Sequence, residues 1–342
     1  SALLLRATDS LRFVPDGANS DTASVTFRAW DQGSGSAGTK ADASTNGGMT
    51  AFSTATETAS ITVTSVNDAP TFNVGDGIVS TDILSTKEFI NGVTIQPDGK
   101  ILAAGYVNSG SDYDFLLARY NADGSLDSDF GSGGIVTTSI GTNVEFGYSV
   151  ALQTDSKILV AGQSFNGSNY DFAVLRYNSD GSLDTTFSDD GKLTTSITVQ
   201  DYAYSVAVQD DGKILVGGKT VLADNSYEFA LVRYDSDGLL DTTFSDDGRF
   251  TTPLDTSATS DKGYNMALQS DGKILLSGRS YNGTRYEFSV VRINTDGTLD
   301  TTFGGDGKVT TDIGTSMSEV SDIAVQDDGK ILVTGASYID GN

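Results

Sequence analysis

The sequence predicts an all-β protein, most of which is a partial β-propeller of about five four-stranded blades with the last one incomplete. Three observations predict this fold class. A unit of about 57 residues recurs, each unit divides into four short strands, and Asn-Gly or Asp-Gly turns separate those strands. Repeats of this length cannot bury their apolar faces alone, so they stack on one another.

Each repeat is marked by Gln-x-Asp-Gly-Lys-Ile-Leu near its start and Asp-Gly-x-Leu-Asp-x-x-Phe near its end. The glutamines stand at Gln96, Gln153, Gln209, Gln269 and Gln326, so successive ones are 57, 56, 60 and 57 residues apart. The closing phenylalanines stand at Phe72, Phe130, Phe187, Phe244 and Phe303. This regularity predicts one supersecondary unit per repeat.

The repeat between residues 147 and 198 shows the four expected strands. They cover residues 148–153, 157–165, 170–177 and 192–196, and the turns include Asn166-Gly167 and Asp180-Gly181. Turns of this kind favour tight hairpins because glycine and asparagine adopt positive φ readily. Four antiparallel strands per repeat are typical of a propeller blade.

The second strand of each repeat is apolar throughout, as in Ile-Leu-Val-Ala-Gly, which indicates burial on both faces between neighbouring blades. The blades are expected near residues 93–138, 148–195, 204–252, 264–311 and 321–342, within a propeller domain over residues 71–342. The fifth repeat stops before its third strand, so we expect the natural chain to continue. Residues 77–81 are expected as an outer strand that closes the ring on the final blade.

Residues 1–70 stand apart from the repeat. Residues 11–14, 23–29 and 58–65 alternate as half-buried strands and predict a partial β-sandwich. The motifs Ala29-Trp-Asp-Gln-Gly33 and Val66-Asn-Asp-Ala-Pro70 resemble the second half of a bacterial cadherin-like domain. That resemblance implies calcium ligation by Asp31, Asn67 and Asp68. The alternative is that Asn67 and Asp68 form a solvated turn before Pro70.

The repeat motif string over residues 72–342 resembles the delta-60-repeat β-propellers of bacterial secreted proteins. Together with the cadherin-like half domain, it is similar to the giant secreted RTX-type adhesins. The resemblance implies the fold and an extracellular or cell-surface location.

Charge and composition exclude several functions. The 342 residues carry 46 acidic and 21 basic side chains, a net charge of −25, which disfavours binding to nucleic acid or anionic membranes. The chain has no cysteine and no histidine, so disulfides, thiolate catalysis and Ser-His-Asp triads are excluded. No apolar run is long enough to insert into a membrane. We expect no cofactor other than calcium.

Loops of varying length and recurring aromatic residues predict a binding face on one side of the propeller. Three tyrosines enter the innermost strand at equivalent positions: Tyr148, Tyr204 and Tyr264, with Asn91 and Ser321 in the other repeats. Aromatic–acidic pairs open the third strands: Tyr113-Asp114, Tyr170-Asp171, Tyr227-Glu228 and Tyr286-Glu287. Such rings and carboxylates suit a saccharide or a peptide, although tyrosine also simply fits strands.

Two further recurrences are interpreted as structural. The Asp-Gly pairs at Asp123, Asp180, Asp237 and Asp296 lack the spacing of calcium loops and predict hairpin turns. One arginine per repeat is expected to pair with an acid of its own blade; the arginines are Arg119, Arg176, Arg233 and Arg292, and the acids are Asp127, Asp184, Asp241 and Asp300.

The leading hypothesis is a non-catalytic segment of a large extracellular or cell-surface adhesin or matrix protein. In it the propeller is a binding or assembly scaffold for a protein, a glycan or copies of itself. One alternative is a propeller enzyme that acts on polysaccharides with carboxylates and tyrosine, with Glu145 and Glu319 as the least repetitive acids. Another is a self-assembling filament or sheath subunit.

Overall fold

The computed structural model describes residues 2–3, 21–27, 40–41, 57–63, 78–83, 87–110, 112–141, 144–254, 262–314 and 318–338, the first four segments by their backbone alone. The chain divides into two compact units, Ser1–Ala69 and Pro70–Asn342. All described elements are β-strands, and no described helix is long and apolar enough to cross a membrane.

Two antiparallel strand pairs are described in the first unit. β1 (Ala2–Leu3) pairs with β3 (Lys40–Ala41), and β2 (Asp21–Phe27) pairs with β4 (Glu57–Val63). β2 and β4 fall on two of the predicted strands. The cadherin-like sandwich stays a prediction, and its proposed calcium ligands Asp31, Asn67 and Asp68 lie outside the described residues.

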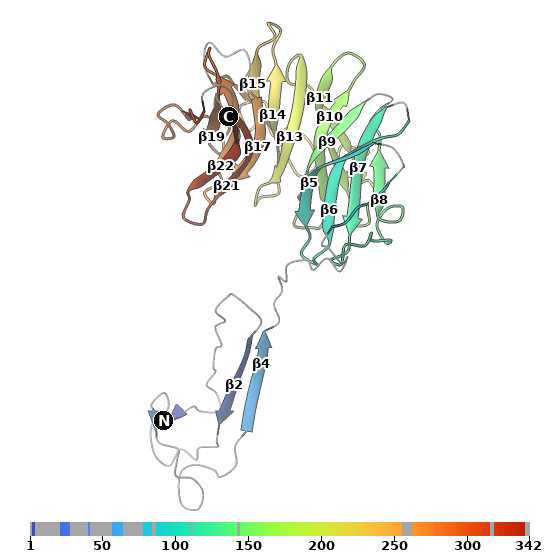
Figure 1. The fold of residues 1–342 in the computed structure, drawn as a ribbon, viewed down its shortest axis with the longest axis vertical. Helices are drawn as coiled ribbons and strands as arrows, with labels where there is room; N and C mark the ends of the chain where they lie inside the picture. Colours follow the sequence, from blue (N-terminus) through green and yellow to red (C-terminus); the bar gives the residue numbers. More distant parts are fainter. Residues whose placement is uncertain are drawn as a thin grey trace, which may run out of the picture. The chain divides into compact units, whose positions relative to one another are not determined.

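The second unit contains four four-stranded antiparallel sheets, each in sequential strand order. Figure 1 shows them side by side from β5 to β19. The first sheet comprises β5 (Glu88–Ile95), β6 (Ile101–Asn108), β7 (Tyr113–Tyr120) and β8 (Ile135–Thr138). The second comprises β9 (Glu145–Leu152), β10 (Ile158–Phe165), β11 (Tyr170–Tyr177) and β12 (Lys192–Thr195). The third comprises β13 (Gln200–Val208), β14 (Ile214–Val221), β15 (Tyr227–Tyr234) and β16 (Arg249–Thr252). The fourth comprises β17 (Lys262–Leu268), β18 (Ile274–Tyr281), β19 (Tyr286–Ile293) and β20 (Lys308–Thr311).

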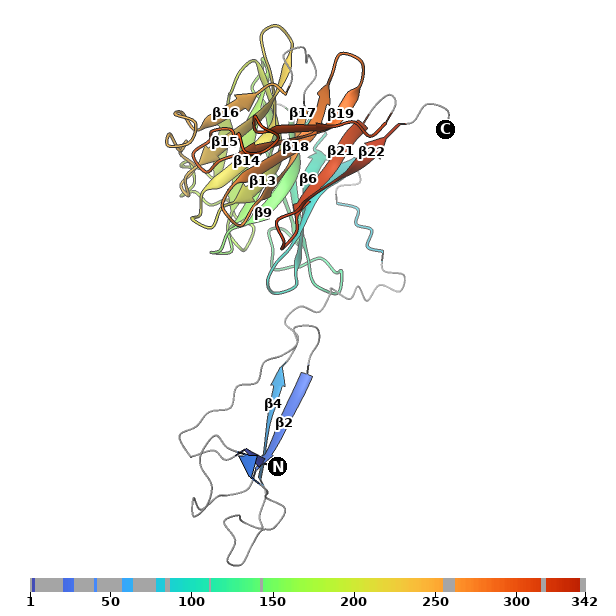
Figure 2. The same ribbon diagram turned by 90° about the vertical axis from the view of Figure 1, so that its left-hand side faces the viewer.

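A fifth sheet holds two strands, β21 (Ser318–Val325) and β22 (Ile331–Ser337). In Figure 2 this hairpin lies beside β17 and β18 of the fourth sheet. The prediction of four complete blades and an incomplete fifth is confirmed, and we number them as blades 1 to 5 in chain order.

The apolar core lies between neighbouring blades. In β10, for example, Leu159 packs towards blade 3 beside Val206, whereas Ile158 and Val160 pack towards blade 1 beside Leu102. All three β10 residues are fully buried. The continuous apolar second strand is therefore buried on both faces, as its sequence predicts.

Among the described residues the sheet of β21 and β22 contains no third strand, so the described part of the predicted closing strand 77–81, residues 78–81, does not pair with the final blade. Instead, the Tyr120 hydroxyl donates to Thr81 Oγ1 at 3.1 Å. Tyr177 bonds Thr138 at 2.8 Å and Tyr234 bonds Thr195 at 2.7 Å in the same way, each threonine lying in the outer strand of the preceding blade. Thr81 thus occupies the place that the outer strand of a blade before blade 1 would occupy.

Candidate functional site

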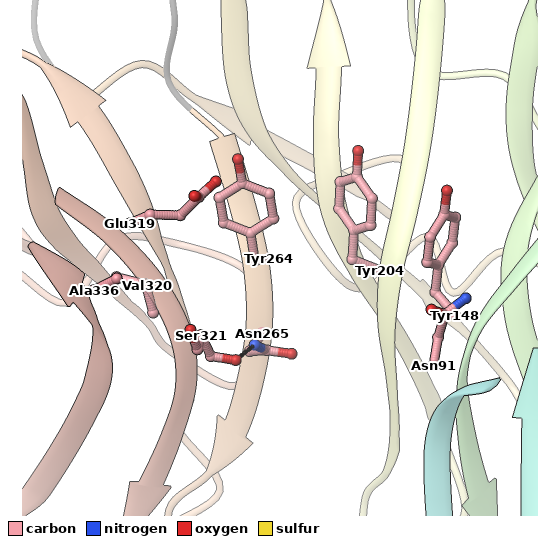
Figure 3. A pocket seen from close by; sticks show the side chains of 9 residues that line it. All are labelled: Asn91, Tyr148, Tyr204, Tyr264, Asn265, Glu319, Val320, Ser321 and Ala336. Atoms are coloured by element: carbon pink, nitrogen blue, oxygen red, sulfur yellow. Dashed lines mark hydrogen bonds between the residues drawn. The ribbon is translucent and has the colours of Figure 1, made fainter. Parts of the chain in front are cut away.

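A cavity of about 350 Å³ opens where the inner strands of all five blades meet. Its lining, shown in Figure 3, consists of Asn91, Tyr148, Tyr204, Tyr264, Asn265, Glu319, Val320, Ser321 and Ala336. The five positions aligned from the repeat, one from each inner strand, therefore converge on one space. Ligand binding at this space stays a prediction.

Each of these five positions is the extra residue of a β-bulge. The pairing of β9 with β10 skips Tyr148, because Ser149 lies opposite Ala161 while Gly147 lies opposite Gly162. The same register shift occurs in the other four sheets, and it skips Asn91, Tyr204, Tyr264 and Ser321. A bulge interrupts the alternation of side chains and turns one residue out of the ladder. The bulges thus aim one side chain per blade into the cavity.

The three tyrosines form a contiguous aromatic wall. The ring centroids of Tyr148 and Tyr204 lie 5.1 Å apart, and those of Tyr204 and Tyr264 lie 5.5 Å apart. In Figure 3 their hydroxyls point to the same side. Burial, with smaller contributions from neighbouring tyrosines, raises the pKa of Tyr148 to about 12. Burial likewise raises the pKa of Tyr264 to about 12 and also that of Tyr204, so all three phenols are neutral donors at physiological pH.

One charged group lines the cavity. Arg279 Nη1 contacts Glu319 Oε1 at 3.1 Å, and the Arg279 guanidinium also lies over the Tyr286 ring, 4.4 Å from its centroid. Figure 3 shows the Glu319 carboxylate extending towards Tyr264. The amides are oriented by the neighbouring blade: Asn91 Nδ2 donates to Gly147 O at 2.8 Å and Asn265 Nδ2 to Ser321 O at 2.5 Å.

The tyrosines that open the third strands do not line the cavity. Tyr113 packs against Tyr106 and Phe146 at 5.5 and 5.6 Å, and Tyr170 packs against Tyr202 at 5.7 Å. In the next two blades a cation takes part: Lys219 Nζ lies 5.2 Å from the Tyr227 ring centroid, and Tyr286 faces Arg279. These rings form an aromatic belt outside the cavity. The belt packs behind the residues that line the cavity and supports them.

The acids beside those tyrosines are also outside the cavity lining. Asp171 is 8% exposed and accepts from Asn166 Nδ2 at 2.8 Å, and Glu287 accepts from Asn282 Nδ2 at 2.5 Å. Glu228 lies opposite Thr220 in the sheet. Asp114 lies near Glu145 of the next blade, where its charge acts on the pKa of that side chain.

Glu145 is not unique among the repeats, because another blade has an acid at the equivalent position. It is fully buried at the start of β9, opposite Ser164, and Asp201 occupies the same place at the start of β13, opposite Thr220. Burial, followed by the charge of Asp114, raises the pKa of Glu145 to about 7. Burial also raises the pKa of Asp201, whose carboxylate accepts from the backbone N–H groups of Ile197 and Thr198. The expectation that Glu145 is one of the least repetitive acids is therefore wrong, because blade 3 has an acid at the equivalent position.

Sequence reasoning missed several residues of the second strands and of the innermost strands β17 and β21. Ala336, Val320 and Asn265 line the cavity, and Tyr106 and Lys219 belong to the aromatic belt. Alignment of the repeats around the bulge would have placed Asn265 at the cavity, since it directly follows Tyr264. Within the described part of the chain, no three acidic side chains gather where a metal ion would be held.

Comparison with known proteins agrees with the repeat architecture. Four segments match the family model described as Domain of unknown function (DUF5122) beta-propeller, at residues 96–130, 153–187, 209–244 and 269–303. These four segments are similar to the repeat of that β-propeller family. Each matched segment runs from the glutamine before the second strand to the closing phenylalanine. No curated protein matches the sequence at a significant level.

Several solved structures are similar at low identity. A gluconolactonase from Xanthomonas campestris is 15% identical over 72% of this chain and 69% of its own, with a TM-score of 0.41. A catalytically inactive virginiamycin B lyase from Staphylococcus aureus is 13% identical over 74% and 80%, with a TM-score of 0.39. The GH43_1 enzyme from Xanthomonas citri complexed with xylose is 9% identical over 75% and 92%, with a TM-score of 0.37. At this level of similarity they carry no inference about activity.

Proposed function

We propose that the DUF5122 unit is a non-catalytic binding scaffold within a large extracellular or cell-surface adhesin or matrix protein. The observation that carries the proposal is the convergence of five equivalent bulge residues on one cavity. A ligand site at a pseudo-symmetry axis with three neighbouring phenols suits recognition. The acidic surface and the resemblance to secreted adhesins support the extracellular setting.

The chemistry of the lining favours a hydroxyl-rich or amide-rich ligand, such as a saccharide or a polar peptide. Tyr148, Tyr204 and Tyr264 offer neutral hydroxyl donors beside apolar ring faces, which suits ligands that alternate polar and apolar patches. Glu319 adds an acceptor, and Asn91 adds amide groups. The aromatic belt holds these rings in position.

The same lining argues against hydrolysis of glycosides. That chemistry needs two carboxylates with different protonation states on either side of the bond. Glu319 is the single carboxylate of this lining, and it is paired with Arg279. Glu145 is buried elsewhere in the sheet.

The test is a screen of glycans and peptides against the intact chain, followed by calorimetry on the variants Tyr204→Phe and Tyr264→Phe. Each variant removes one hydroxyl and keeps the ring, so affinity should fall about fivefold, the value of a hydrogen bond of about 1 kcal/mol. Tyr120→Phe is the matched control, because its hydroxyl bonds Thr81 instead.

Equal losses of ligand affinity in Tyr120→Phe and Tyr204→Phe would show that the ligand does not bind in the cavity. If the chain cleaved a polysaccharide and Glu319→Gln abolished that activity, the protein would be an enzyme and not a binding scaffold.

A further inference from the structure

The backbone of the recurring glutamine closes the turn that follows the innermost strand. In blade 2, Gln153 N–H donates to Lys157 O at 2.9 Å, and Gln153 O accepts from Ser156 N–H at 3.0 Å. The glutamines of blades 1, 3 and 4 make the same two backbone hydrogen bonds, with a glycine in place of Ser156. These bonds need one backbone N–H and one carbonyl, which nearly every residue type offers. The turn therefore does not explain why the side chain is an amide.

The amide oxygen of this side chain is buried without a hydrogen-bond partner in all four complete blades. Among the described residues, no donor bonds Oε1 of the four glutamines, which are Gln96, Gln153, Gln209 and Gln269. Gln96 as a whole is 8% exposed. A buried carbonyl oxygen without a donor costs free energy, and the interiors of folded proteins rarely contain one. Four such oxygens at one repeated position indicate that a ligand supplies the donor in each blade.

The side chain of a lysine starts next to each of these glutamines. Gln153 and Lys157 are paired across the hairpin of β9 and β10, so their side chains leave the same face of the sheet. Lys157 Nζ contacts Asp184 Oδ2 at 3.0 Å and donates to Asn178 Oδ1 at 3.0 Å. An ammonium group carries three N–H donors, so one remains beyond these two acceptors. The equivalent lysines contact the equivalent acids: Lys100 with Asp127, Lys213 with Asp241, and Lys273 with Asp300.

This face of the sheet is turned towards the next blade. Arg176 bonds Asp184 through Nε at 2.7 Å, and its Nη1 donates to Ser236 O in blade 3. The arginines of blades 1 and 3 reach the following blade in the same way. The glutamine side chain therefore lies at the junction between two blades, on the face that carries a lysine ammonium and an arginine guanidinium.

The chemistry of this junction selects the ligand. The ligand has to donate to a carbonyl oxygen, which excludes an anion that only accepts. In blade 2, Lys157 and Arg176 outnumber Asp184 on this face, so a metal cation would be repelled. In the described part of the chain, no three acidic side chains gather to offset that repulsion. Water is small and neutral, and it both donates and accepts, so it suits a carbonyl oxygen beside an ammonium group.

We propose that each complete blade binds one buried water molecule, which donates to the glutamine Oε1 and accepts from Nζ of the lysine four residues later. The four sites are Gln96–Lys100, Gln153–Lys157, Gln209–Lys213 and Gln269–Lys273. Each water joins the innermost strand to the lysine–aspartate–arginine cluster at the junction with the next blade. The constant spacing of glutamine and lysine in the repeat is then the spacing of the two groups that hold the water.

The first measurement is a crystal structure of the intact chain at high resolution. A water oxygen should lie about 2.7–3.2 Å from Oε1 at all four positions. A protein donor bonded to Oε1, a metal ion in place of the water, or an absence of density at any of the four positions would overturn the proposal.

The second measurement uses the variants Gln153→Met and Gln209→Met, which keep an unbranched side chain and remove the acceptor. Each variant should lose one long-lived water, counted by water magnetic relaxation dispersion, and should melt about 2 °C lower in calorimetry. Thr154→Met is the matched control, because Thr154 is exposed in the same turn. The control should keep both the number of long-lived waters and the melting temperature of wild type.

The sign of the melting shift separates a bound water from an unpaired oxygen. If Oε1 had no partner at all, its removal would relieve an unfavourable burial, and Gln153→Met would melt at a higher temperature than wild type. A higher or unchanged melting temperature, or an unchanged number of long-lived waters, would contradict the proposal.

Discussion

At the scale of single residues, the recurring arginine is a clamp between blades. Arg119, Arg176, Arg233 and Arg292 each bond an acid of their own blade through Nε, at 2.6–2.8 Å. Each guanidinium lies 4.4–4.6 Å from the centroid of the closing phenylalanine ring. In the first three blades Nη1 also donates to a turn carbonyl of the next blade. The structural interpretation of these arginines is confirmed.

Removing one clamp should cost much more stability than removing an exposed ion pair. For Arg176→Ala we expect a loss of about 3 kcal/mol in the free energy of unfolding, because Arg176 and Asp184 are 4% and 3% exposed. Arg285→Ala breaks the more exposed pair with Asp312 and should cost less than about 1 kcal/mol. Urea denaturation monitored by fluorescence measures both, and equal losses would contradict the clamp.

Glu145 makes stability depend on pH. Its carboxyl is faced by Asp114, Ser139, Ser164 and the backbone N–H of Gly141, and its pKa in the folded chain is about 7 against an ordinary value of 4.5. The folded state therefore prefers the protonated form, and stability falls as the pH rises from about 4.5 to about 7. At pH 8 we expect Glu145→Gln to be more stable than wild type by about 2–3 kcal/mol.

At pH 4 the difference between Glu145→Gln and wild type should vanish, because both side chains are then neutral. Thermal or urea unfolding across this pH range checks the prediction. Asp210→Asn, at an exposed turn, is the control and should not change the difference between the two pH values. A stabilisation of Glu145→Gln that is the same at pH 4 and pH 8 would contradict ionisation as its cause.

At the scale of elements, the bulge of the innermost strand explains the glycine of the second strand. A Cβ on Gly162 would lie 1.9 Å from the carbonyl oxygen of Phe146, and Gly105, Gly218 and Gly335 are equally confined in their own sheets. The bulge that turns a tyrosine into the cavity brings the preceding backbone against the neighbouring strand. The repeated glycine and the cavity are thus consequences of one distortion.

Gly162→Ala should therefore destabilise the propeller by about 2–3 kcal/mol or more, since the added methyl group meets backbone that cannot rotate away. It should also displace Tyr148 and weaken any ligand bound in the cavity. Gly141→Ala is the matched control, because nothing lies within 4 Å of the position that its methyl group would take. Calorimetric melting of the two variants decides the matter, and similar melting temperatures would refute the close approach.

At the scale of the whole molecule, stability should fall from the middle blades towards the ends. Blades 2 and 3 are covered on both faces, whereas blade 1 and the β21–β22 hairpin each have one open face. In a repeat protein each unit is stabilised by its neighbours, so a unit with one neighbour opens more readily. The exposed Val93 and Leu332 mark the two weaker ends.

Hydrogen exchange followed by mass spectrometry measures this gradient in a dilute sample. The amides of β14, where every residue is buried, should exchange slowest, and those of β22 should exchange fastest among the second strands. Uniform protection across all second strands would show a single cooperative unit instead.

The sequence predicted more of the fold than of the candidate site. The glutamine turns, the apolar second strands and the closing phenylalanines predicted the blades and their number, because these features are local and recur. Alignment of the repeats also matched Tyr148, Tyr204 and Tyr264 with one another. The mistake about Glu145 arose because its equivalent, Asp201, is a different residue type, although it stands at the same spacing, three residues before the aligned tyrosine.

The sequence by itself determined the repeat, the strand order within a blade and the structural role of the arginines, since each depends on contacts within or next to one unit. The tertiary structure alone decided which tyrosines share a cavity and which form the belt around it, because a one-residue bulge reverses the side a residue faces. It also decided that Thr81 lies against blade 1. Closure of a ring depends on contacts between the most distant repeats, and local sequence patterns do not encode those contacts.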